Sequence, residues 1–420
     1  MPESYRAPRG VSDILPADQP YWRWLRDTAV RVAESYGYGE IQTPVFERAG
    51  VFIRQEARGT DVVDKEIYVF EDRGGDELAL RPEGTAAVCR SFLEHGMGSL
   101  PQPVRLYYLS DFFRYDRPQA GRYRMFHQFG VEAIGDSEPA IDAEVLDLLR
   151  TFYDALGLTG YRLMLNSIGD PVCRPAYIEK LRAYYADKLG RLCGDCQRRF
   201  ELNPLRMLDC KNEPCQPFKA GAPRISDNLC NPCAEHFAKV KGLLDDLGIV
   251  YQPDPLLVRG LDYYARTTFE FEPVGSDSQQ SAIGAGGRYD GLMEQLGGKP
   301  TPGIGFGAGI ERIILNLKAQ GLESPVAAPP DAYLAIVDAA AESRAMVLAR
   351  ELRLGGARVI TGAAGRSMKS QMRQANALGA RFALVLGERE LADGSVSVRD
   401  LAAQSQEIVP AAEVLGRIKG

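Results

Sequence analysis

Arginines, carboxylates and an amide recur in segments of the sequence that alternate like β-strands. In MFHQFGVEAI, the side chains of Gln128 and Glu132 point to the same face as Gly130, which has no side chain. This spacing leaves room for a small polar ligand between an amide and a carboxylate. Arg114 and Arg259 are always charged, so they cannot act as general bases and are suited to stabilising phosphate or carboxylate oxygens.

The same residues also allow a structural interpretation. Arg259 and Asp262 would then form a buried ion pair, and Gln128 and Glu132 would be the polar face of an edge strand. Phosphoryl transfer depends mostly on positioning and electrostatic stabilisation, which arginines on strands can supply. The same arginines can equally form structural ion pairs. The residue types alone leave both interpretations open.

Six of the eight cysteines lie in one short segment, and a C-x-x-C pair stands at each end of it. Such pairs are typical of zinc sites. The leading hypothesis is a structural zinc ion that staples a module with a small core, held by Cys193, Cys196, Cys230 and Cys233. Cys210 and Cys215 are the alternative second pair. A further possibility is that the cysteines are small buried apolar residues, some of them paired under oxidation.

The composition is that of an ordinary globular protein. The chain has 420 residues, 45% hydrophobic and 25% charged, which excludes disordered and fibrous classes. No stretch approaches the ~18 apolar residues of a membrane span, and the first residues lack the apolar core of a signal peptide, so we expect a cytoplasmic protein without membrane contact. The net charge of −6 argues against a nucleic-acid scaffold. Residues 344–381 are nevertheless strongly basic, which predicts contact with RNA unless they only form a solvated helix surface.

Hydrophobic periodicity predicts the elements that position these residues. A helix is predicted from Pro20 to Tyr36 and a strand from Ile41 to Phe46. Two β-rich stretches around the loop DRPQAGR predict a long hairpin over residues 104–134. A helix is predicted from Asp142 to Leu156, and another opens after the glycine-rich segment GIGFGAG.

Changes in composition divide the chain into parts. Residues 171–247 combine helical segments with cysteines and prolines and are interpreted as an inserted module. The insert would separate two parts of a catalytic domain, 1–170 and 248–325. After the proline-rich segment GLESPVAAPPD, alternating strands and helices in residues 330–420 predict a small α/β domain.

Several motifs resemble those of class II aminoacyl-tRNA synthetases. RLYYLSDFFRYDRPQAGRYRMFHQFGVEAIG resembles motif 2, GIGFGAGIERI resembles motif 3 and contains Arg312, and IQTPVFERAGVF resembles motif 1. The segments PRGVSDILP, ALRPEGT, RGLDYYARTTFEF and GGRYDGL are similar to those of the histidyl-tRNA synthetase family in particular. The resemblance covers nearly the whole chain, including the C-terminal domain.

The resemblance implies a fold class and a reaction. The fold class is α/β: an α+β catalytic domain with an antiparallel class II sheet flanked by helices, the helical insertion, and a C-terminal α/β anticodon-binding domain. Motif 1 would lie at a homodimer interface. The enzyme would activate L-histidine with ATP and Mg²⁺ to histidyl adenylate and pyrophosphate, and would then transfer histidine to the 3′ end of tRNA(His).

The resemblance also assigns roles around the phosphates. Arg114 would hold the α-phosphate and the attacking carboxylate, and Arg259 would stabilise charge at the α-phosphate. Arg312 would bind the γ-phosphate side. The class commonly has Arg-x-Glu in motif 2, whereas this chain has Arg114-Tyr115-Asp116, so Asp116 would contact ATP with a shorter acid.

Other residues would surround the amino acid. The α-amino group would be held by Glu83, Thr85 and Gln128. The imidazole would be held by Glu132, Tyr263 and Tyr264. A neutral imidazole has one N–H donor and one acceptor, which a carboxylate and a phenol match. Because a pocket that hydrogen-bonds its substrate rejects isosteres by roughly 10⁴–10⁵, no editing domain is required.

Two groups of residues are expected to contact tRNA. The motif 2 loop would reach ATP or the acceptor end through Arg117, Gln119 and Arg122. The basic C-terminal region would contact the anticodon arm through Arg366, Lys369 and Arg373.

Two other functional classes compete with this interpretation. A regulatory subunit that resembles the family and associates with ATP phosphoribosyltransferase is expected to lose catalytic arginines and the C-terminal domain, whereas this chain retains Arg114, Arg259 and Arg312. A pure RNA-binding module would not need the face formed by Gln128 and Glu132. Histidine-dependent exchange of pyrophosphate into ATP would separate the three classes.

Overall fold

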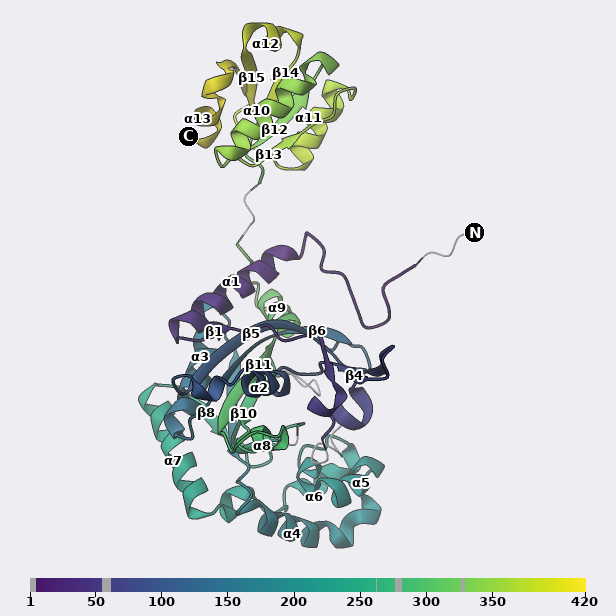
Figure 1. The fold of residues 1–420 in the computed structure, drawn as a ribbon, viewed down its shortest axis with the longest axis vertical. Helices are drawn as coiled ribbons and strands as arrows, with labels where there is room; N and C mark the ends of the chain where they lie inside the picture. The colour runs from purple at the N-terminus through teal and green to yellow at the C-terminus, as the bar shows by residue number, and fades with distance from the viewer. Residues whose placement is uncertain (1–4, 55–61, 262, 276–281, 326–328) are drawn as a thin grey trace. The chain divides into compact units, whose positions relative to one another are not determined.

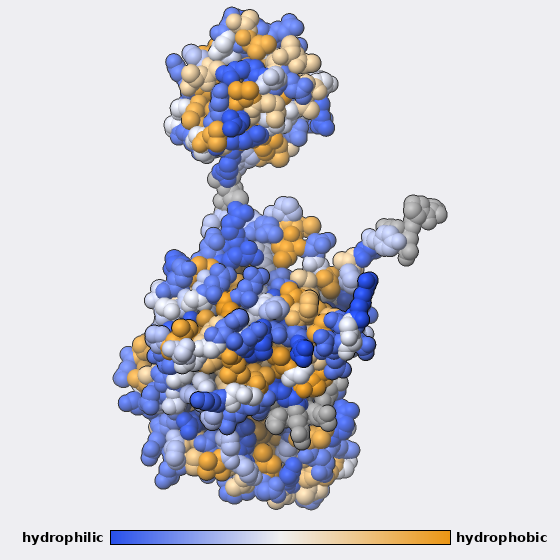
Figure 2. All heavy atoms as spheres, in the orientation of Figure 1, coloured by the Kyte–Doolittle hydropathy of each residue, from blue (hydrophilic) through white to orange (hydrophobic). Residues whose placement is uncertain are grey.

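The computed structural model describes residues 5–54, 62–261, 263–275, 282–325 and 329–420. The chain divides into two compact units, Met1–Pro325 and Val326–Gly420. In the described ranges, none of the helices is long and apolar enough to cross a membrane. On the face drawn in Figure 2, hydrophilic and hydrophobic residues are interspersed over both units.

An eight-stranded sheet forms the centre of the first unit (Figure 1). Its neighbouring strands are, in order, β1 (Gly39–Glu40), β5 (Val104–Phe113), β6 (Met125–Ile134), β11 (Gly303–Gly309), β10 (Gly284–Arg288), β9 (Ala265–Pro273), β7 (Tyr161–Ser167) and β8 (Tyr251–Pro253). The two edge pairs are parallel and the other pairs are antiparallel. The predicted hairpin is confirmed, because β5 and β6 pair from Val104 opposite Ile134 to Phe113 opposite Met125.

Three helices cover one face of this sheet: α1 (Gln19–Ser35), α3 (Pro139–Ala155) and α9 (Ile310–Ala319). Aromatic side chains fill the core between the layers. The ring centroid of Phe129 on β6 lies 4.9 Å from that of Phe152 on α3 and 5.5 Å from that of Phe306 on β11. Side chains alternate along a strand, so this core leaves the opposite face of β6 to Gln128 and Glu132.

The opposite face carries smaller elements. A three-stranded sheet has the order β2 (Phe46–Arg48), β4 (Glu77–Leu80) and β3 (Val69–Glu71). The helices on this side are α2 (Thr85–Glu94), α8 (Leu292–Gln295), and the short η1 (Ala49–Val51), η2 (Val62–Glu66) and η3 (Met97–Ser99). The first residues of α2 reach the pocket face of β6.

The predicted strand from Ile41 to Phe46 is wrong. β1 ends at Glu40 and β2 begins at Phe46, so the segment between them passes from one sheet to the other. The carbonyls of Thr43 and Pro44 accept hydrogen bonds from the buried guanidinium of Arg81, at 2.7 and 3.4 Å, where a strand would pair with a neighbour. Pro44 also lacks the N–H that a ladder requires.

The inserted module lies between β7 and β8. It contains α4 (Arg174–Tyr185), η4 (Ala186–Arg191), α5 (Gly194–Leu202), η5 (Pro204–Met207), η6 (Glu213–Cys215), α6 (Gln216–Lys219), η7 (Ile225–Asn228) and α7 (Asn231–Asp246). In Figure 1, α4, α5 and α6 form a group below the sheet, and α7 runs from there toward α3. Tyr177 and Leu181 of the module share a hydrophobic core with Phe112 and Tyr264, so the module packs on the first unit's main body.

The second unit is a five-stranded sheet with helices. The strand order is β13 (Val359–Thr361), β12 (Ala332–Ile336), β14 (Phe382–Leu386), β15 (Ser395–Asp400) and β16 (Ser405–Pro410). The first three strands are parallel, and β15 and β16 are antiparallel. The helices are η8 (Ala339–Ala341), α10 (Glu342–Leu354), α11 (Met368–Ala377), α12 (Glu388–Asp393), η9 (Ala411–Glu413) and α13 (Val414–Lys419). This is the α/β pattern expected for residues 330–420.

Candidate active site

Glycines in and beside β6 allow polar side chains to pack closely against this strand. Gly305 and Gly307 of β11 lie opposite Glu132 and Gly130. A Cβ atom on Gly305 would collide with the Glu132 carboxylate, and a Cβ atom on Gly130 would collide with the Tyr108 ring. The glycines therefore make room for the Tyr108 ring and the Glu132 carboxylate, and the Tyr108 ring occupies the space above Gly130 that the sequence analysis left to a ligand.

Glu132 is fully buried in this pocket. Its Oε1 accepts hydrogen bonds from the Thr85 hydroxyl at 2.7 Å and from the Tyr108 hydroxyl at 3.3 Å. Its Oε2 forms no hydrogen bond of normal geometry with a described residue, but the buried Tyr289 hydroxyl lies close enough to the carboxylate to lower its pKa. Burial raises the pKa of this carboxyl from 4.5 to about 8. A buried oxygen without a donor is costly, so Oε2 is suited to accept an N–H from a ligand.

Glu83 is a second buried carboxylate, located at the N-terminus of α2. It accepts the backbone N–H groups of Thr85 at 2.6 Å and Ala86 at 3.0 Å, and the hydroxyl of Tyr263 at 3.1 Å. Burial raises its pKa, and these donors together with Arg54 oppose that increase. Glu83 therefore supports the helix terminus and Tyr263 as well as adding negative charge to the pocket.

Two buried tyrosines and an arginine form the next part of the site. The ring centroids of Tyr263 and Tyr264 lie 4.9 Å apart. The Cζ of Arg259 lies 5.6 Å from the centroid of the Tyr264 ring, and its guanidinium pairs with Glu270 on β9. Asp262, the partner considered from the sequence, lies outside the described residues. The structure thus gives Arg259 a different carboxylate partner.

Within the described part of the chain, the side-chain hydrogen bonds of Arg114 and Arg312 all go to backbone carbonyls. Arg114 donates to the carbonyl of Pro82 at 2.9 Å, and Arg312 donates to those of Gly121 at 2.8 Å and Ala282 at 2.9 Å. In the described part of the chain, neither forms an ion pair. Burial lowers the pKa of Arg312, and the nearby cations Arg114 and Arg122 lower it further. This concentration of positive charge suits a polyphosphate.

The loop between β5 and β6 holds the other motif 2 residues. The carboxylate of Asp116 pairs with Arg122, and the backbones of Gln119 and Arg122 bond to each other. Arg117 and Gln119 are exposed. The structure therefore pairs Asp116 within the loop, and presents Arg117 and Gln119 to solvent.

The expected tRNA contacts of the second unit lie around the start of α11. Arg366, Lys369 and Arg373 are all exposed. None of the three forms an ion pair with any described residue. By contrast, three other arginines of this unit have carboxylate partners, namely Arg344, Arg389 and Arg417.

The sequence interpretation missed Tyr108 and Arg54. Tyr108 lies opposite Gly130 in the hairpin and donates to Glu132, so an explicit hairpin register would have identified it. The Cζ of Arg54 lies 5.7 Å from the centroid of the Tyr263 ring. No spacing rule links Arg54 to that tyrosine, because the two residues meet only through the tertiary fold.

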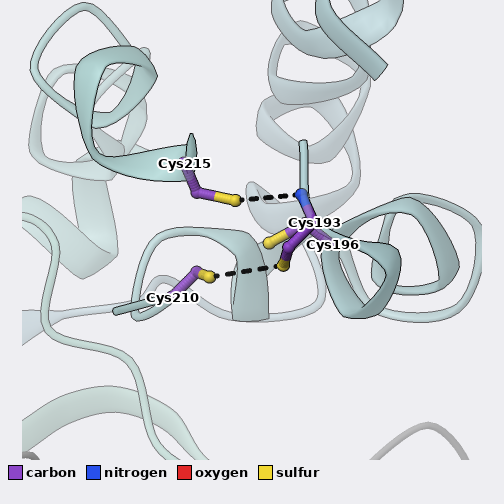
Figure 3. Close-up of side chains that lie close together, drawn as sticks. All are labelled: Cys193, Cys196, Cys210 and Cys215. Carbon is purple, nitrogen blue, oxygen red and sulfur yellow. Dashed lines mark hydrogen bonds between the residues drawn. The ribbon is translucent and has the colours of Figure 1, made fainter. Parts of the chain in front are cut away.

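Four cysteines meet at the start of α5 (Figure 3). The Sγ atoms of Cys193, Cys196, Cys210 and Cys215 all lie within 4.8 Å of one another. The Cys193 and Cys210 Sγ atoms are 3.8 Å apart, and the backbone N–H of Cys193 donates to the Cys215 Sγ at 3.3 Å. We call this group the α5 cysteine cluster.

The leading zinc set of the sequence analysis needs correction. Cys230 and Cys233 do not join Cys193 and Cys196 but lie with Asp170 and Cys173 in a second group. The physical reason is topological. The module is inserted after β7, so the start of α7 returns to the point where the module begins, whereas the α5 cysteine cluster closes a loop within the module. Cys210 and Cys215, the alternative pair, take the second position beside Cys193 and Cys196.

Comparison with known proteins agrees with this geometry. The family model described as histidyl-tRNA synthetase matches residues 10–174 and 222–313, and the model described as anticodon binding domain matches residues 331–420. Together these segments contain the β6 pocket, both arginine-bearing motifs and the whole C-terminal sheet.

Full-length relatives extend the match. The histidine–tRNA ligase of Dehalococcoides mccartyi strain 195 is 52% identical over 99% of both chains, and that of Desulforamulus reducens is 47% identical over 98% of both. The crystal structure of apo histidyl-tRNA synthetase from S. aureus is 37% identical, with a TM-score of 0.83, and covers 99% of this chain and 100% of its own. This chain therefore belongs to the histidyl-tRNA synthetase family of class II aminoacyl-tRNA synthetases.

Proposed function

We propose that the β6 pocket binds L-histidine beside ATP and that the chain joins this histidine to tRNA(His). The chain is a histidine–tRNA ligase, an aminoacyl-tRNA synthetase that uses ATP. The observation that carries the pocket assignment is the fully buried Glu132, whose carboxylate accepts the hydroxyls of Thr85 and Tyr108 and lies against Gly305. Because charging supplies translation, we place the protein in the cytoplasm.

The histidine side chain would lie between Glu132 and the tyrosines. The Glu132 Oε2 would accept the imidazole N–H, and the Tyr264 phenol would donate to the other ring nitrogen. Tyr263 would pack against the ring, since its hydroxyl already donates to Glu83. Glu83 and Gln128 would face the α-amino group. Thr85 would act mainly by orienting Glu132, since its hydroxyl already donates to that carboxylate.

The arginines would then carry the chemistry at phosphate. A histidine carboxylate oxygen attacks the α-phosphorus of Mg²⁺-bound ATP, and the bond to the bridging oxygen of pyrophosphate breaks. Arg114 would hold the carboxylate and the α-phosphate, Arg259 would stabilise the charge that develops there, and Arg312 would bind the γ-phosphate. In the second step, a terminal ribose hydroxyl of tRNA attacks the acyl carbon, and AMP leaves.

Pyrophosphate exchange tests this assignment. We expect label from pyrophosphate to enter ATP only when histidine is present, and tRNA to accept histidine and no isosteric analogue. A regulatory subunit would bind histidine without exchange, and an RNA-binding module would bind tRNA without either activity. Either outcome would contradict the proposed function.

We further propose a four-part chain that acts as a homodimer. The catalytic parts are 1–170 and 248–325, the insert is 171–247 and the anticodon-binding domain is 330–420. Val45 and Phe46 of the motif 1 segment, and Phe70 on β3, are large exposed apolar side chains, as expected of a surface that another subunit covers. Light scattering on the purified protein should give twice the mass of one chain.

The exposed basic side chains at the start of α11 would bind the anticodon arm of tRNA. Replacing Arg366, Lys369 and Arg373 with glutamine should weaken tRNA binding and flatten its salt dependence, by about one unit of slope for each phosphate that is no longer neutralised. Pyrophosphate exchange should not change, because these residues lie in the second unit. Filter binding over a salt series measures the effect.

The matched control replaces Arg344, Arg389 and Arg417, which also lie on the second unit but are paired with carboxylates. This variant has the same change in net charge. If both triple variants bind tRNA with equally reduced affinity, the reduction reflects overall charge, and the assignment of the α11 face is wrong.

The α5 cysteine cluster would bind one structural zinc ion. Four thiolates are a common structural zinc set, and tetrahedral Zn–S bonds of about 2.3 Å place sulfur atoms roughly 3.8 Å apart. The Cys193–Cys210 distance of 3.8 Å fits this spacing. Burial raises the pKa of the Cys193 thiol, but hydrogen bonds from Asn212, Cys196 and Cys215 outweigh it and lower the value to about 6. Burial raises the pKa of the Cys196 and Cys210 thiols of the same cluster, so zinc binding would have to displace their protons.

Loss of this zinc is expected to destabilise the module. A Cys193→Ser/Cys196→Ser variant should contain one zinc ion fewer per chain than the wild type and should melt at a lower temperature. Elemental analysis of protein purified without chelator measures the metal. An unchanged melting temperature when zinc is added to metal-free protein would count against the site.

A further inference from the structure

A second group of metal-ligand side chains lies where the inserted module leaves and rejoins the catalytic sheet. Asp170 and Cys173 follow β7, and Cys230 and Cys233 stand at the start of α7. One ligand atom from each of the four lies within 4.8 Å of the others. Three sulfurs and one carboxylate oxygen complete a four-coordinate set for zinc. The Cys173 and Cys233 Sγ atoms are 3.9 Å apart, close to the spacing of roughly 3.8 Å in a tetrahedral site.

The ligands are held in place by their surroundings. The Asp170 Oδ1 accepts the backbone N–H groups of Val172 at 3.0 Å and Cys173 at 3.2 Å. The Asp170 Oδ2 lies 3.6 Å from the guanidinium of Arg266. Outer groups of this kind orient ligands in established metal sites. The group is therefore ordered without requiring a metal to gather it.

Two arginines lie beside this group. The half-buried guanidinium of Arg174 donates to the carbonyls of Ile168, Gly169 and Tyr264, at 3.2, 2.9 and 2.8 Å. No described carboxylate forms an ion pair with it. A divalent metal ion with three thiolate ligands and one carboxylate ligand carries a net negative charge. Arg174 and Arg266 together would balance that charge.

We propose that Asp170, Cys173, Cys230 and Cys233 bind a second zinc ion, separate from the α5 cysteine cluster, which joins the two ends of the insert and positions the Tyr264 segment of the histidine pocket. The connection to the pocket is short. Arg174 follows the ligand Cys173 and holds the Tyr264 carbonyl. Arg266 contacts Asp170 and bonds through its backbone N–H to the Gly169 carbonyl at 2.7 Å. This positioning role rests on the proposed function of the pocket, whereas the metal site does not.

Metal content is the first test. The full-length protein, expressed with added zinc and purified without chelator, should contain two zinc ions per chain. A Cys173→Ser/Cys233→Ser variant and the Cys193→Ser/Cys196→Ser variant should each retain one. The control is Cys89→Ser, which removes a buried thiol of α2 outside both groups and should retain two.

Other metal contents overturn the proposal. The proposal is wrong if the wild type contains one zinc ion and the Cys173→Ser/Cys233→Ser variant still contains it. Iron in place of zinc would also overturn the proposal. Thiol titration of the unfolded, unreduced protein adds a further check, since a Cys173–Cys233 disulfide would exclude the site. Should the double variant fail to fold, Asp170→Asn and Cys230→Ser must each release one zinc to a competing chelator more readily than the wild type, by at least the roughly 10–100-fold typical of losing an outer group that only orients a ligand.

The positioning role has its own kinetic test. Asp170→Asn should raise the KM for histidine by about tenfold while leaving the KM for ATP nearly unchanged, because the metal site supports Tyr264 and not the phosphate side. Equal changes in both KM values would refute the positioning role but not the metal site. If the wild type shows no histidine-dependent pyrophosphate exchange, the proposed function is wrong. The zinc content would still test the metal site on its own.

Discussion

Replacing Arg259 with alanine is expected to slow histidyl adenylate formation by about 10²–10³-fold. Its guanidinium lies beside the Tyr264 ring of the histidine pocket, where charge would develop on the α-phosphate as pyrophosphate leaves. A planar guanidinium binds phosphate oxygens through two parallel N–H groups, so Arg259→Lys should recover only part of the rate. Histidine-dependent pyrophosphate exchange measures this step directly.

The pair with Glu270 provides the decisive control. If Arg259 served only to neutralise Glu270, Glu270→Gln would lower activity and melting temperature as much as Arg259→Ala. We expect Glu270→Gln to keep most of the exchange rate. Arg162→Ala removes an exposed arginine of β7 that pairs at 3.2 Å with Glu272, a residue of β9 like Glu270. This variant should keep the wild-type exchange rate. Near-normal exchange by Arg259→Ala would disprove the catalytic assignment.

The local elements were predictable where periodicity and turn residues agree. The β5–β6 hairpin follows from alternation on both sides of a proline- and glycine-containing loop, and α1 follows from apolar residues at helical spacing. The segment from Ile41 to Phe46 also looks like a strand, but its carbonyls bond to the Arg81 side chain. A tertiary contact with a distant guanidinium outweighs local propensity there, and no window of the sequence contains that information.

The candidate site, like the fold, could be predicted from the sequence only in part. The face shared by Gln128, Gly130 and Glu132 follows from strand alternation, but the Tyr108 ring that lies over Gly130 was not predicted from it. The cysteine grouping could not be read from spacing. Both C-x-x-C pairs have the correct local form, yet which pair meets which depends on the path of the chain between them.

Glu132→Gln is expected to lower kcat/KM for histidine by roughly 10–150-fold, the value of a hydrogen bond to a charged group. Glutamine keeps the size of the side chain and can still accept the Thr85 and Tyr108 hydroxyls. It would, however, turn an N–H group or a weaker acceptor toward the imidazole N–H. The KM for ATP should change little, which separates this effect from general damage to the site.

The raised pKa of Glu132 provides a second test, which measures how protein stability depends on pH. The folded protein raises this pKa from 4.5 to about 8, so it binds the proton more tightly than the unfolded chain does. This contribution to the free energy of unfolding is therefore complete at low pH and decreases as the pH rises from about 5 to about 8. The melting temperature of Glu132→Gln should depend less on pH over that range.

Histidine and a control variant complete this prediction. Saturating histidine should flatten the pH dependence of the wild type, because its imidazole N–H stabilises the ionised Glu132, and the same histidine concentration should raise the melting temperature of Glu132→Gln less than that of the wild type. The matched control is Glu144→Gln, which removes a carboxylate of α3 paired with Arg105 at 2.9 Å, away from the pocket face. It should retain both the wild-type pH dependence and the response to histidine. If Glu132→Gln is stabilised by histidine as strongly as the wild type, the imidazole does not bind at Glu132.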